Sequence, residues 1–355
     1  MFDSGGLQAV PRIERVSATP CEIPLRRAFA TARDALARQV TLPVLIRIDC
    51  DDGLTALGEA VAVGYVTGES QASMVADVER AAARMLGGDV LRTRALTDAL
   101  AEALPESPSA RAGIEIALWN AHADALGVSL WRLWGGAADR VQTDVTLSLA
   151  DDPAAAAREA ARQGFASFKV KVSGGAPDDD FRRLVAVAEA VPGAALRVDA
   201  NQGFDAAGAL AFAARLAKAG LPVEAFEQPV AADDLAALDA VAASSPIPVF
   251  ADEAVKTPAD ALRVVRETRA HGINVKLMKS GVSGAFDIVA IARAAGRRLM
   301  IGCMLETRRG IAASLAFAAG TGAFELADLD SHLLLREEGP NPHFLQDGPE
   351  MRVLG

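Results

Sequence analysis

The stretch Phe168-Lys169-Val170-Lys171-Val172 has the β-branched and aromatic composition of a short buried strand. Its two lysines are two residues apart, so both side chains point to the same side of the strand. Four further strand-like segments carry an acid or a lysine near their ends: Arg197-Val198-Asp199-Ala200-Asn201, Ala225-Phe226-Glu227-Gln228-Pro229, Val249-Phe250-Ala251-Asp252-Glu253 and Ile273-Asn274-Val275-Lys276-Leu277-Met278. We expect all five segments to converge on one site.

The spacing of these segments predicts a parallel α/β barrel. Lys169 to Asp199 spans 30 residues, and the next intervals, to Glu227, Asp252 and Lys276, are 28, 25 and 24 residues. Each interval fits a strand, a helix and two loops. Candidate strands at Thr143 to Leu149, Arg298 to Gly302 and Ala323 to Asp328 bring the number to about eight, which closes a barrel. An open doubly wound sheet is the alternative, but its phosphate-binding turn would have only Ser173-Gly174-Gly175 as a candidate.

The first third of the chain predicts a separate α+β domain. Strand patterns at Ile13 to Pro20, Leu42 to Asp49 and Ala56 to Ala62 include a hairpin, and Ser70 to Gly127 has helical periodicity. The segment Leu25 to Arg38 is rich in arginine and small residues, which favours an exposed loop. We place the domains at residues 1–130 and 131–330, with a tail at 331–355 that returns to the first domain.

Composition narrows the function classes. The 355 residues contain 36 basic and 46 acidic side chains, a net charge of −10, without a basic run that could follow a phosphate backbone. Nucleic acid is therefore not an expected partner. The three cysteines are scattered, no leader pattern begins the chain, and no run of about 18 apolar residues occurs, so we expect a soluble cytoplasmic protein without a membrane partner.

Three acids from three consecutive strands predict a metal site. In a parallel barrel, reactive groups lie at the carboxyl ends of the strands. Asp199, Glu227 and Asp252 would form an all-oxygen anionic cluster, which suits a hard cation such as Mg²⁺. Any one of these acids alone is better explained as a helix cap or a surface ion pair. Three in register on consecutive strands favour the metal site.

The lysines indicate proton transfer. Lys169 and Lys171 lie on the second barrel strand and Lys276 follows the sixth, which is diametrically opposite in a ring of eight. A substrate on the metal would have an ammonium group on each face, the arrangement needed to invert a stereocentre beside a carboxylate through a metal-stabilised enediolate. We expect repulsion between Lys169 and Lys171, together with the cation, to lower a lysine pKa toward neutrality.

With these motifs the chain resembles the enolase superfamily, in its muconate-lactonizing subgroup, and within it the dipeptide epimerases. The likeness rests on the Lys-x-Lys, Asp-x-Asn, Glu-Gln-Pro, Asp-Glu and Lys-x-Met-Lys set, on Gly58-Glu59-Ala60 and on Leu133-Trp134-Gly135-Gly136. It implies a (β/α)7β-type modified TIM barrel with an N-terminal α+β capping domain, usually in a homo-oligomer. It assigns Asp199, Glu227 and Asp252 as Mg²⁺ ligands, Lys171 and Lys276 as the acid/base pair, Lys169 as a substrate-carboxylate contact, and Asn201, Gln228 and Glu253 as their supports.

The eighth strand bears on the substrate. Asp328-Leu329-Asp330 places two carboxylates on one side of its end, and such a pair requires a cation. In the dipeptide epimerases a matching pair holds the free α-ammonium group. The resemblance also places Thr146 and Met304 in the pocket and makes the Leu25 to Arg38 segment a specificity loop. In this loop Arg33 is the candidate contact to the substrate. It lies one position from the place where epimerases acting on Ala-Glu carry an arginine.

Other reactions stay open at this point. N-acylamino acid racemases, o-succinylbenzoate synthases and muconate cycloisomerases share the lysine pair, but a blocked amine or an aromatic acid has no use for two carboxylates. The sugar-acid dehydratases use a histidine after the seventh strand, near Gly302, where this chain has none. A barrel that binds a ligand without turning it over is the alternative from another class.

Overall fold

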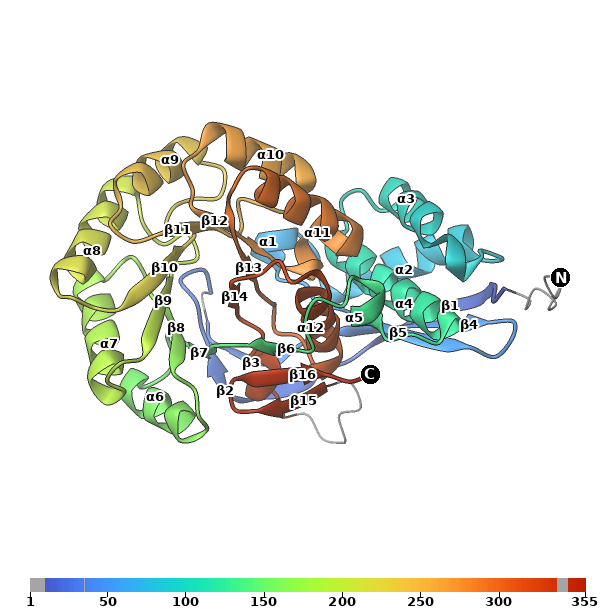
Figure 1. The fold of residues 1–355 in the computed structure, drawn as a ribbon, viewed down its shortest axis with the longest axis horizontal. Helices are drawn as coiled ribbons and strands as arrows, with labels where there is room; N and C mark the ends of the chain where they lie inside the picture. The colour runs from blue at the N-terminus through green and yellow to red at the C-terminus, as the bar shows by residue number, and fades with distance from the viewer. Residues whose placement is uncertain (1–9, 35, 337–343) are drawn as a thin grey trace, which may run out of the picture.

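The computed structural model describes residues 10–34, 36–336 and 344–355. A barrel occupies one side of the molecule and a smaller α+β domain lies beside it (Figure 1). Residues 337–343 of the predicted tail lie outside the described part.

Eight parallel strands form the barrel in sequence order: β7 (Val145–Leu147), β8 (Ser167–Lys171), β9 (Ala195–Asp199), β10 (Val223–Glu227), β11 (Val249–Ala251), β12 (Gly272–Val275), β13 (Arg298–Ile301) and β14 (Leu326–Ala327). Seven helices alternate with them: α6 (Pro153–Arg162), α7 (Pro177–Ala190), α8 (Ala206–Lys218), α9 (Leu235–Ser244), α10 (Pro258–Glu267), α11 (Leu277–Ala294) and α12 (Arg308–Thr321). The backbone N–H of Asp144 donates to Ala327 O at 3.1 Å and joins the first strand to the last. The predicted (β/α)7β barrel is confirmed.

One end of the barrel interior is filled by an apolar layer. Ala225, Phe250, Met300 and Leu326, on strands β10, β11, β13 and β14, form a separate buried cluster. Phe250 pairs with Gly272 on the next strand, and a Cβ at residue 272 would lie 2.2 Å from the phenyl ring. The glycine therefore makes room for the ring that plugs the barrel below the acid-bearing ends.

The N-terminal domain packs helices on a small antiparallel sheet. The sheet has the order β1 (Ile13–Pro20), β4 (Val44–Cys50), β5 (Thr55–Ala60), and its helices are α2 (Gln71–Met85), α3 (Thr93–Ala103) and α4 (Pro108–Leu126), with short turns α1 (Gly64–Thr67), η1 (Val90–Arg92) and α5 (Leu130–Leu133). Helix α4 is buried on most sides because it lies between this sheet and helix α11 of the barrel. Its Glu115 accepts a hydrogen bond from Ser283 N at 2.8 Å, so α4 ties the two domains together.

The segment expected to be an exposed loop is mostly a hairpin. Strand β2 (Ile23–Phe29) pairs with β3 (Arg38–Thr41), and the hairpin packs against the barrel. Thr41 donates to Leu305 O at 2.7 Å and Ala30 N donates to Ser148 Oγ at 2.7 Å, which fixes the hairpin across the mouth. The loop prediction was wrong because these tertiary contacts, absent from the sequence pattern, extend the chain.

The described tail has two parts. Turn η2 (Ser331–Leu334) runs beside β2, where Arg336 N donates to Pro24 O at 2.8 Å. Strands β15 (Phe344–Asp347) and β16 (Glu350–Val353) then pair with β6 (Arg140–Gln142), and the buried Phe344 and Met351 belong to the barrel core. The tail thus contacts the hairpin first and the barrel afterwards.

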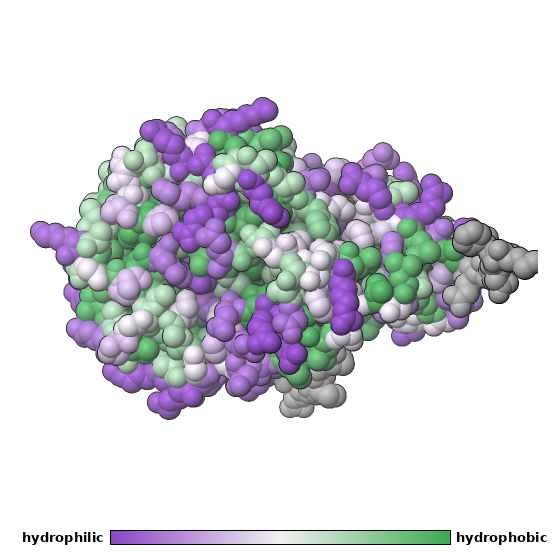
Figure 2. All heavy atoms as spheres, in the orientation of Figure 1, coloured by the Kyte–Doolittle hydropathy of each residue, from purple (hydrophilic) through white to green (hydrophobic). Residues whose placement is uncertain are grey.

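The exterior carries mixed polarity. The face in Figure 2 has hydrophilic side chains spread over the outer helices with hydrophobic residues between them. In the described part of the chain, no helix combines the length and the apolar character needed to cross a membrane.

We predict that Gly58→Ala destabilises the N-terminal domain. A Cβ at residue 58 would lie 2.0 Å from Gly113 O and 2.8 Å from Ala117 N, both backbone atoms of helix α4 that cannot yield easily. Overpacking of this kind costs about 1–3 kcal/mol. Urea unfolding should show this loss for Gly58→Ala, whereas Gly175→Ala, with open space around its Cβ, should stay within about 0.5 kcal/mol of the parent. Equal stability of the two variants would contradict the close helix-on-sheet contact.

Candidate active site

Strand register brings the predicted residues to one rim of the barrel. Lys171 pairs with Asp199, and Asp199 pairs with Glu227 across three adjacent strands. Asp252 and Lys276 directly follow β11 and β12. All five side chains are buried. The convergence expected from the sequence is therefore present at the carboxyl ends of the strands.

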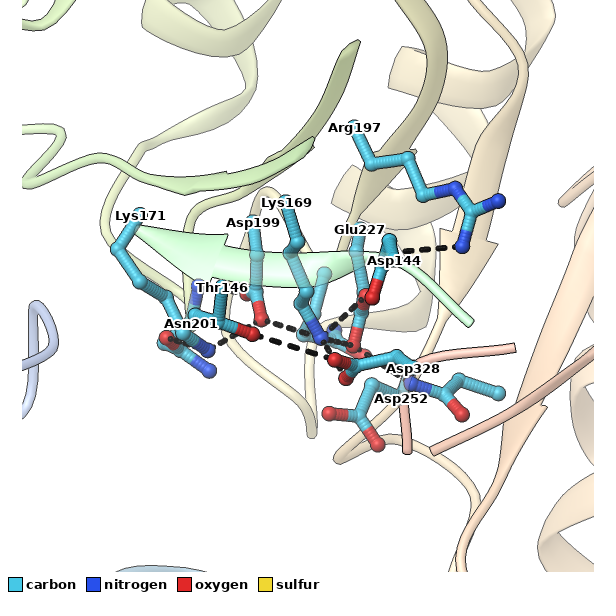
Figure 3. A network of polar contacts seen from close by, with 12 residues as sticks. Asp144, Thr146, Lys169, Lys171, Arg197, Asp199, Asn201, Glu227, Asp252 and Asp328 are labelled. Carbon is cyan, nitrogen blue, oxygen red and sulfur yellow. Dashed lines mark hydrogen bonds and ion pairs between the residues drawn. The ribbon is translucent and has the colours of Figure 1, made fainter. Parts of the chain in front are cut away.

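Lys169 lies at the centre of this rim. Its Nζ is 2.7 Å from Asp328 Oδ2, 3.0 Å from Asp199 Oδ2 and 3.0 Å from Glu227 Oε2. Figure 3 shows the ammonium group among these carboxylates. One cation thus joins acids from the third, fourth and eighth strands.

The other two lysines approach from opposite sides of the barrel. Lys171 Nζ, from the second strand, donates to Asp199 Oδ2 at 2.5 Å and to Asn201 Oδ1 at 3.0 Å. Lys276 Nζ, after the sixth strand, donates to Asp252 Oδ2 at 2.7 Å. Both side chains line one cavity that encloses roughly 590 Å³ including its open mouth. A small molecule in this cavity would have an amine on either side.

The carboxylates around the three lysines raise their pKa values, and the expectation of a lowered lysine pKa beside a bound cation stays a prediction. Burial, the largest single cause, would lower the pKa of Lys171 and of Lys276, but the surrounding carboxylates, led by Asp199 and Asp252 respectively, together raise both. The pKa of Lys169 is also raised, since four carboxylates surround it. Repulsion between the lysines is present but smaller than these attractions.

The carboxylates differ in their electrostatic surroundings. Burial opposes ionisation of Asp199 and Asp252, but nearby lysines lower the pKa of both acids. The largest lysine contribution comes from Lys171 for Asp199 and from Lys276 for Asp252. Burial and the neighbouring Asp199 instead raise the pKa of Glu227 to about 8. Its Oε2 is buried and accepts no hydrogen bond, although Lys169 Nζ lies 3.0 Å away. The neighbouring lysines therefore neutralise the Glu227 carboxylate less fully than those of Asp199 and Asp252.

Asp328 and Asp330 occupy the eighth-strand side of the cavity. Asp328 binds Lys169 and accepts a hydrogen bond from Thr146 Oγ1 at 3.2 Å. Asp330 accepts from Thr146 N at 2.5 Å. Burial and the nearby Asp328 raise the pKa of Asp330 to about 7. Since Asp328 already has a lysine, Asp330 is the member of the pair that a cationic ligand would satisfy.

The N-terminal domain closes the cavity with residues that the sequence did not single out. Phe29, Thr31 and Arg38 come from the β2–β3 hairpin, and Tyr65 comes from α1. The expected contact Arg33 is exposed and does not line the cavity. A tight turn in which Asp34 N donates to Thr31 O at 3.3 Å places Arg33 outward. Arg38, four residues beyond Asp34, is the arginine at the cavity.

This assembly matches known protein families. Residues 152–352 match the family model described as "Enolase C-terminal domain-like", and residues 14–135 match the N-terminal domain of mandelate racemase / muconate lactonizing enzyme. The chain belongs to the enolase superfamily.

Several enolase-superfamily proteins are similar over nearly their full length. The "Aromatic dipeptide epimerase" of Herpetosiphon aurantiacus is 38% identical over 96% of both chains. A substrate-liganded complex of the L-Ala-D/L-Glu epimerase from Bacillus subtilis has a TM-score of 0.93 and 34% identity, and 97% of each chain is covered. A dipeptide epimerase from Enterococcus faecalis, complexed with Mg and L-Leu-L-Tyr, has a TM-score of 0.91 and 30% identity over 96% of this chain and 97% of that one.

The enolase-superfamily barrel also holds supports that sequence reasoning missed or left without a role. Lys279 Nζ donates to Asp252 Oδ1 and Asp252 O, both at 2.5 Å, and to Asn274 O at 3.0 Å, so all three of its donors are used. Asn274 Nδ2 in turn donates to Glu227 Oε1 at 2.7 Å. Unlike the other three lysines, Lys279 does not line the cavity. The Lys-x-Met-Lys spacing contained Lys279, but no pattern assigned it this positioning role.

Two strand-end residues adopt unusual backbone angles. Asn201 has φ 40° and Gln228 has φ 33°, in the left-handed region that residues other than glycine rarely occupy. Asn201 Nδ2 donates to Glu253 Oε1 at 3.2 Å, and Gln228 Oε1 accepts from Asp252 N at 2.8 Å. The Gln228 amide thus connects the ends of the neighbouring strands β10 and β11, and the Asn201 amide reaches from the end of β9 past β10 to the end of β11. These contacts fix the directions in which the acids point.

Met304 lines the cavity on a loop held by a buried acid. Glu306 Oε1 accepts from Met304 N at 2.8 Å, and Glu306 Oε2 is buried without a hydrogen-bond partner. Glu306 Oε2 and Glu59 Oε1 both lie within 3 Å of the point where a Cβ on Gly310 would stand. Burial, assisted by Glu59, raises the pKa of Glu306 to about 8 despite the Met304 hydrogen bond.

Glu306→Gln should change how stability depends on pH. The folded pKa of about 8 exceeds the ordinary value of 4.5, so the native state retains a proton that the unfolded chain releases as the pH rises from 4.5 to 8. Glu306 therefore lowers stability progressively over this window. We expect Glu306→Gln to match the parent near pH 4 and to exceed its free energy of unfolding at pH 9 by about 2–4 kcal/mol.

Urea unfolding at several pH values measures this difference. The control is Glu189→Gln, because Glu189 is exposed on α7. Parallel stability curves for the parent and Glu306→Gln would show that the buried acid is ionised in the native state.

Proposed function

We propose that this chain is a Mg²⁺-dependent dipeptide epimerase that inverts the α-carbon of the C-terminal residue of a dipeptide. The observation that carries the proposal is the pair Lys171 and Lys276, which line one cavity from strands on opposite sides of the barrel. The related proteins named as dipeptide epimerases support the same conclusion.

Asp199, Glu227 and Asp252 would hold the magnesium ion. Among the described residues, no group of three acid, histidine or cysteine side chains is arranged to bind a metal. At this site, lysines lie between the carboxylates. Their donor chemistry nevertheless fits, because all are oxygen ligands and Glu227 Oε2 accepts no hydrogen bond. The related Enterococcus faecalis structure contains Mg. Magnesium would supply a positive charge that binds the substrate carboxylate and stabilises negative charge developing there.

The chain's own groups would move the proton. One lysine of the pair, in its neutral form, takes the α-proton from one face, and the other, as an ammonium, returns a proton to the opposite face. Lys169 contacts the substrate carboxylate and compensates the charge that develops on it. Lys279 and Asn274 keep Asp252 and Glu227 in place during both steps. The β2–β3 hairpin and Tyr65 wall the cavity on the side of the N-terminal domain.

Asp330 and Asp328 would bind the free α-ammonium group of the dipeptide. Thr146 orients both carboxylates through its backbone N–H and hydroxyl. Met304 would contact the substrate between this site and the hairpin. Another lysine-pair reaction on a blocked amine or an aromatic acid is less well supported, because it would leave Asp330 without a cation.

Several expectations from the sequence accompany this proposal. Homo-oligomer formation, a cytoplasmic location and the domain boundaries 1–130, 131–330 and 331–355 stay predictions.

The first test is proton exchange. We expect the protein with Mg²⁺ to exchange the C-terminal α-proton of some member of a broad L-Ala-L-Xaa library in D₂O, followed by NMR, and to lose this activity with EDTA. Lys171→Ala and Lys276→Ala should each lower epimerisation by a factor of about 10²–10⁴. Each variant should retain exchange with only one of the two epimers, because one lysine serves each face. No exchange with any library member would refute the epimerase proposal.

The second test concerns the ammonium site. Asp330→Asn should raise KM for a free dipeptide roughly tenfold to a hundredfold by removing the charge partner of its amine. The affinity for Mg²⁺, measured by calorimetry, should stay unchanged, since Asp330 contacts none of the three proposed ligands. The control substrate is the N-acetylated dipeptide, whose binding should not respond to Asp330→Asn. An unchanged KM for the free dipeptide would remove Asp330 from the substrate site.

A further inference from the structure

The wall of the cavity formed by the N-terminal domain contains a local group of polar and aromatic side chains. Thr31 Oγ1 and Tyr65 Oη lie 3.5 Å apart, and Phe29 and Arg38 line the same cavity. Burial raises the pKa of Tyr65, while the nearby Lys171 ammonium opposes the increase. This group therefore lies on the Lys171 side of the cavity. On the proposed function, on which this inference rests, the side chain attached to the inverted carbon would contact it.

Among the described residues that line this cavity, the only arginine is already paired. Arg38 Nε and Nη2 donate to Asp34 Oδ1 at 2.9 and 2.8 Å. Asp34 Oδ2 accepts from Thr31 N at 3.1 Å and from Thr31 Oγ1 at 2.9 Å, so both of its oxygens are used. The Asp34 side chain is 7% exposed and that of Arg38 is 27% exposed. The guanidinium is therefore charge-balanced by an acid fixed in the turn.

The charge balance affects each class of substrate side chain differently. A glutamate or aspartate side chain would become the second carboxylate on one guanidinium, and repulsion from Asp34 would offset much of the attraction. A lysine or arginine side chain would lie beside the Arg38 guanidinium and would gain no partner from Asp34, which is saturated and does not line the cavity. A neutral apolar side chain requires no charge partner and would contact Phe29, Val63, Val66 and the Tyr65 ring.

We propose that the Asp34–Arg38 ion pair sets the substrate class of this enzyme: dipeptides whose C-terminal residue has a neutral apolar or aromatic side chain. Asp34 acts as a specificity-determining residue without touching substrate. It neutralises Arg38 and thereby disfavours an acidic side chain at that position.

The wild-type protein gives the first test. The kcat/KM values for α-proton exchange of L-Ala-L-Phe and L-Ala-L-Glu are compared in D₂O with Mg²⁺. We expect L-Ala-L-Phe to be favoured by at least about tenfold. Equal values, or a preference for L-Ala-L-Glu, would overturn the inference.

Calorimetric binding of the same two peptides to the Mg²⁺-loaded protein separates this inference from the proposed function. Tighter binding of L-Ala-L-Phe without proton exchange would refute the epimerase while supporting the selectivity. Exchange with no preference between the peptides would support the epimerase and refute the selectivity.

A pair of variants tests the ion pair itself. Asp34→Asn removes the neutralising charge, so the ratio of kcat/KM for L-Ala-L-Glu to that for L-Ala-L-Phe should rise by about tenfold or more. Arg38→Met in the Asp34→Asn background removes the released cation and should abolish this rise. An unchanged ratio in Asp34→Asn would show that Asp34 does not determine selectivity. A rise that persists in the double variant would show that Arg38 is not the group responsible.

Discussion

The structure depends on the neutralisation of buried carboxylates by buried lysines at one end of the barrel. Asp199, Glu227 and Asp328 share the Lys169 ammonium, while Asp252 is held by Lys276 and Lys279. Removing one member would leave an unpaired charge in a dry environment, which costs far more than an exposed ion pair contributes. Such a cluster persists only where rigid strands hold each group, and the parallel barrel provides those strands.

The four lysines of the cluster differ in whether they line the cavity. Lys169, Lys171 and Lys276 line the cavity and contact carboxylate oxygens that could also bind a metal or a cationic ligand. Lys279 lies behind Asp252 with all three donors used. Three ammonium groups therefore border the space that a ligand would occupy, whereas the fourth holds Asp252 from behind.

On the proposed function, the N-terminal domain would select the substrate. Helix α4 fixes the N-terminal domain to α11, and the β2–β3 hairpin lies over the mouth of the barrel. The reactive groups come from strand ends that cannot change without loss of the cluster. The hairpin carries Phe29 and Arg38 and can vary without disturbing the core. The division explains how proteins with this barrel can share chemistry and differ in substrate.

The sequence by itself determined the barrel and its reactive rim. Strand patterns that recur every 24 to 30 residues require parallel crossovers, and parallel strands bring their carboxyl ends together, so Lys171, Asp199, Glu227 and Asp252 were predictable. Tertiary structure alone decided the surroundings of these groups. The raised lysine pKa values depend on distances between strands, and the replacement of Arg33 by Arg38 depends on one turn. Local pattern fixes which side of a strand a residue faces, but contacts between distant segments decide its charge and its partner.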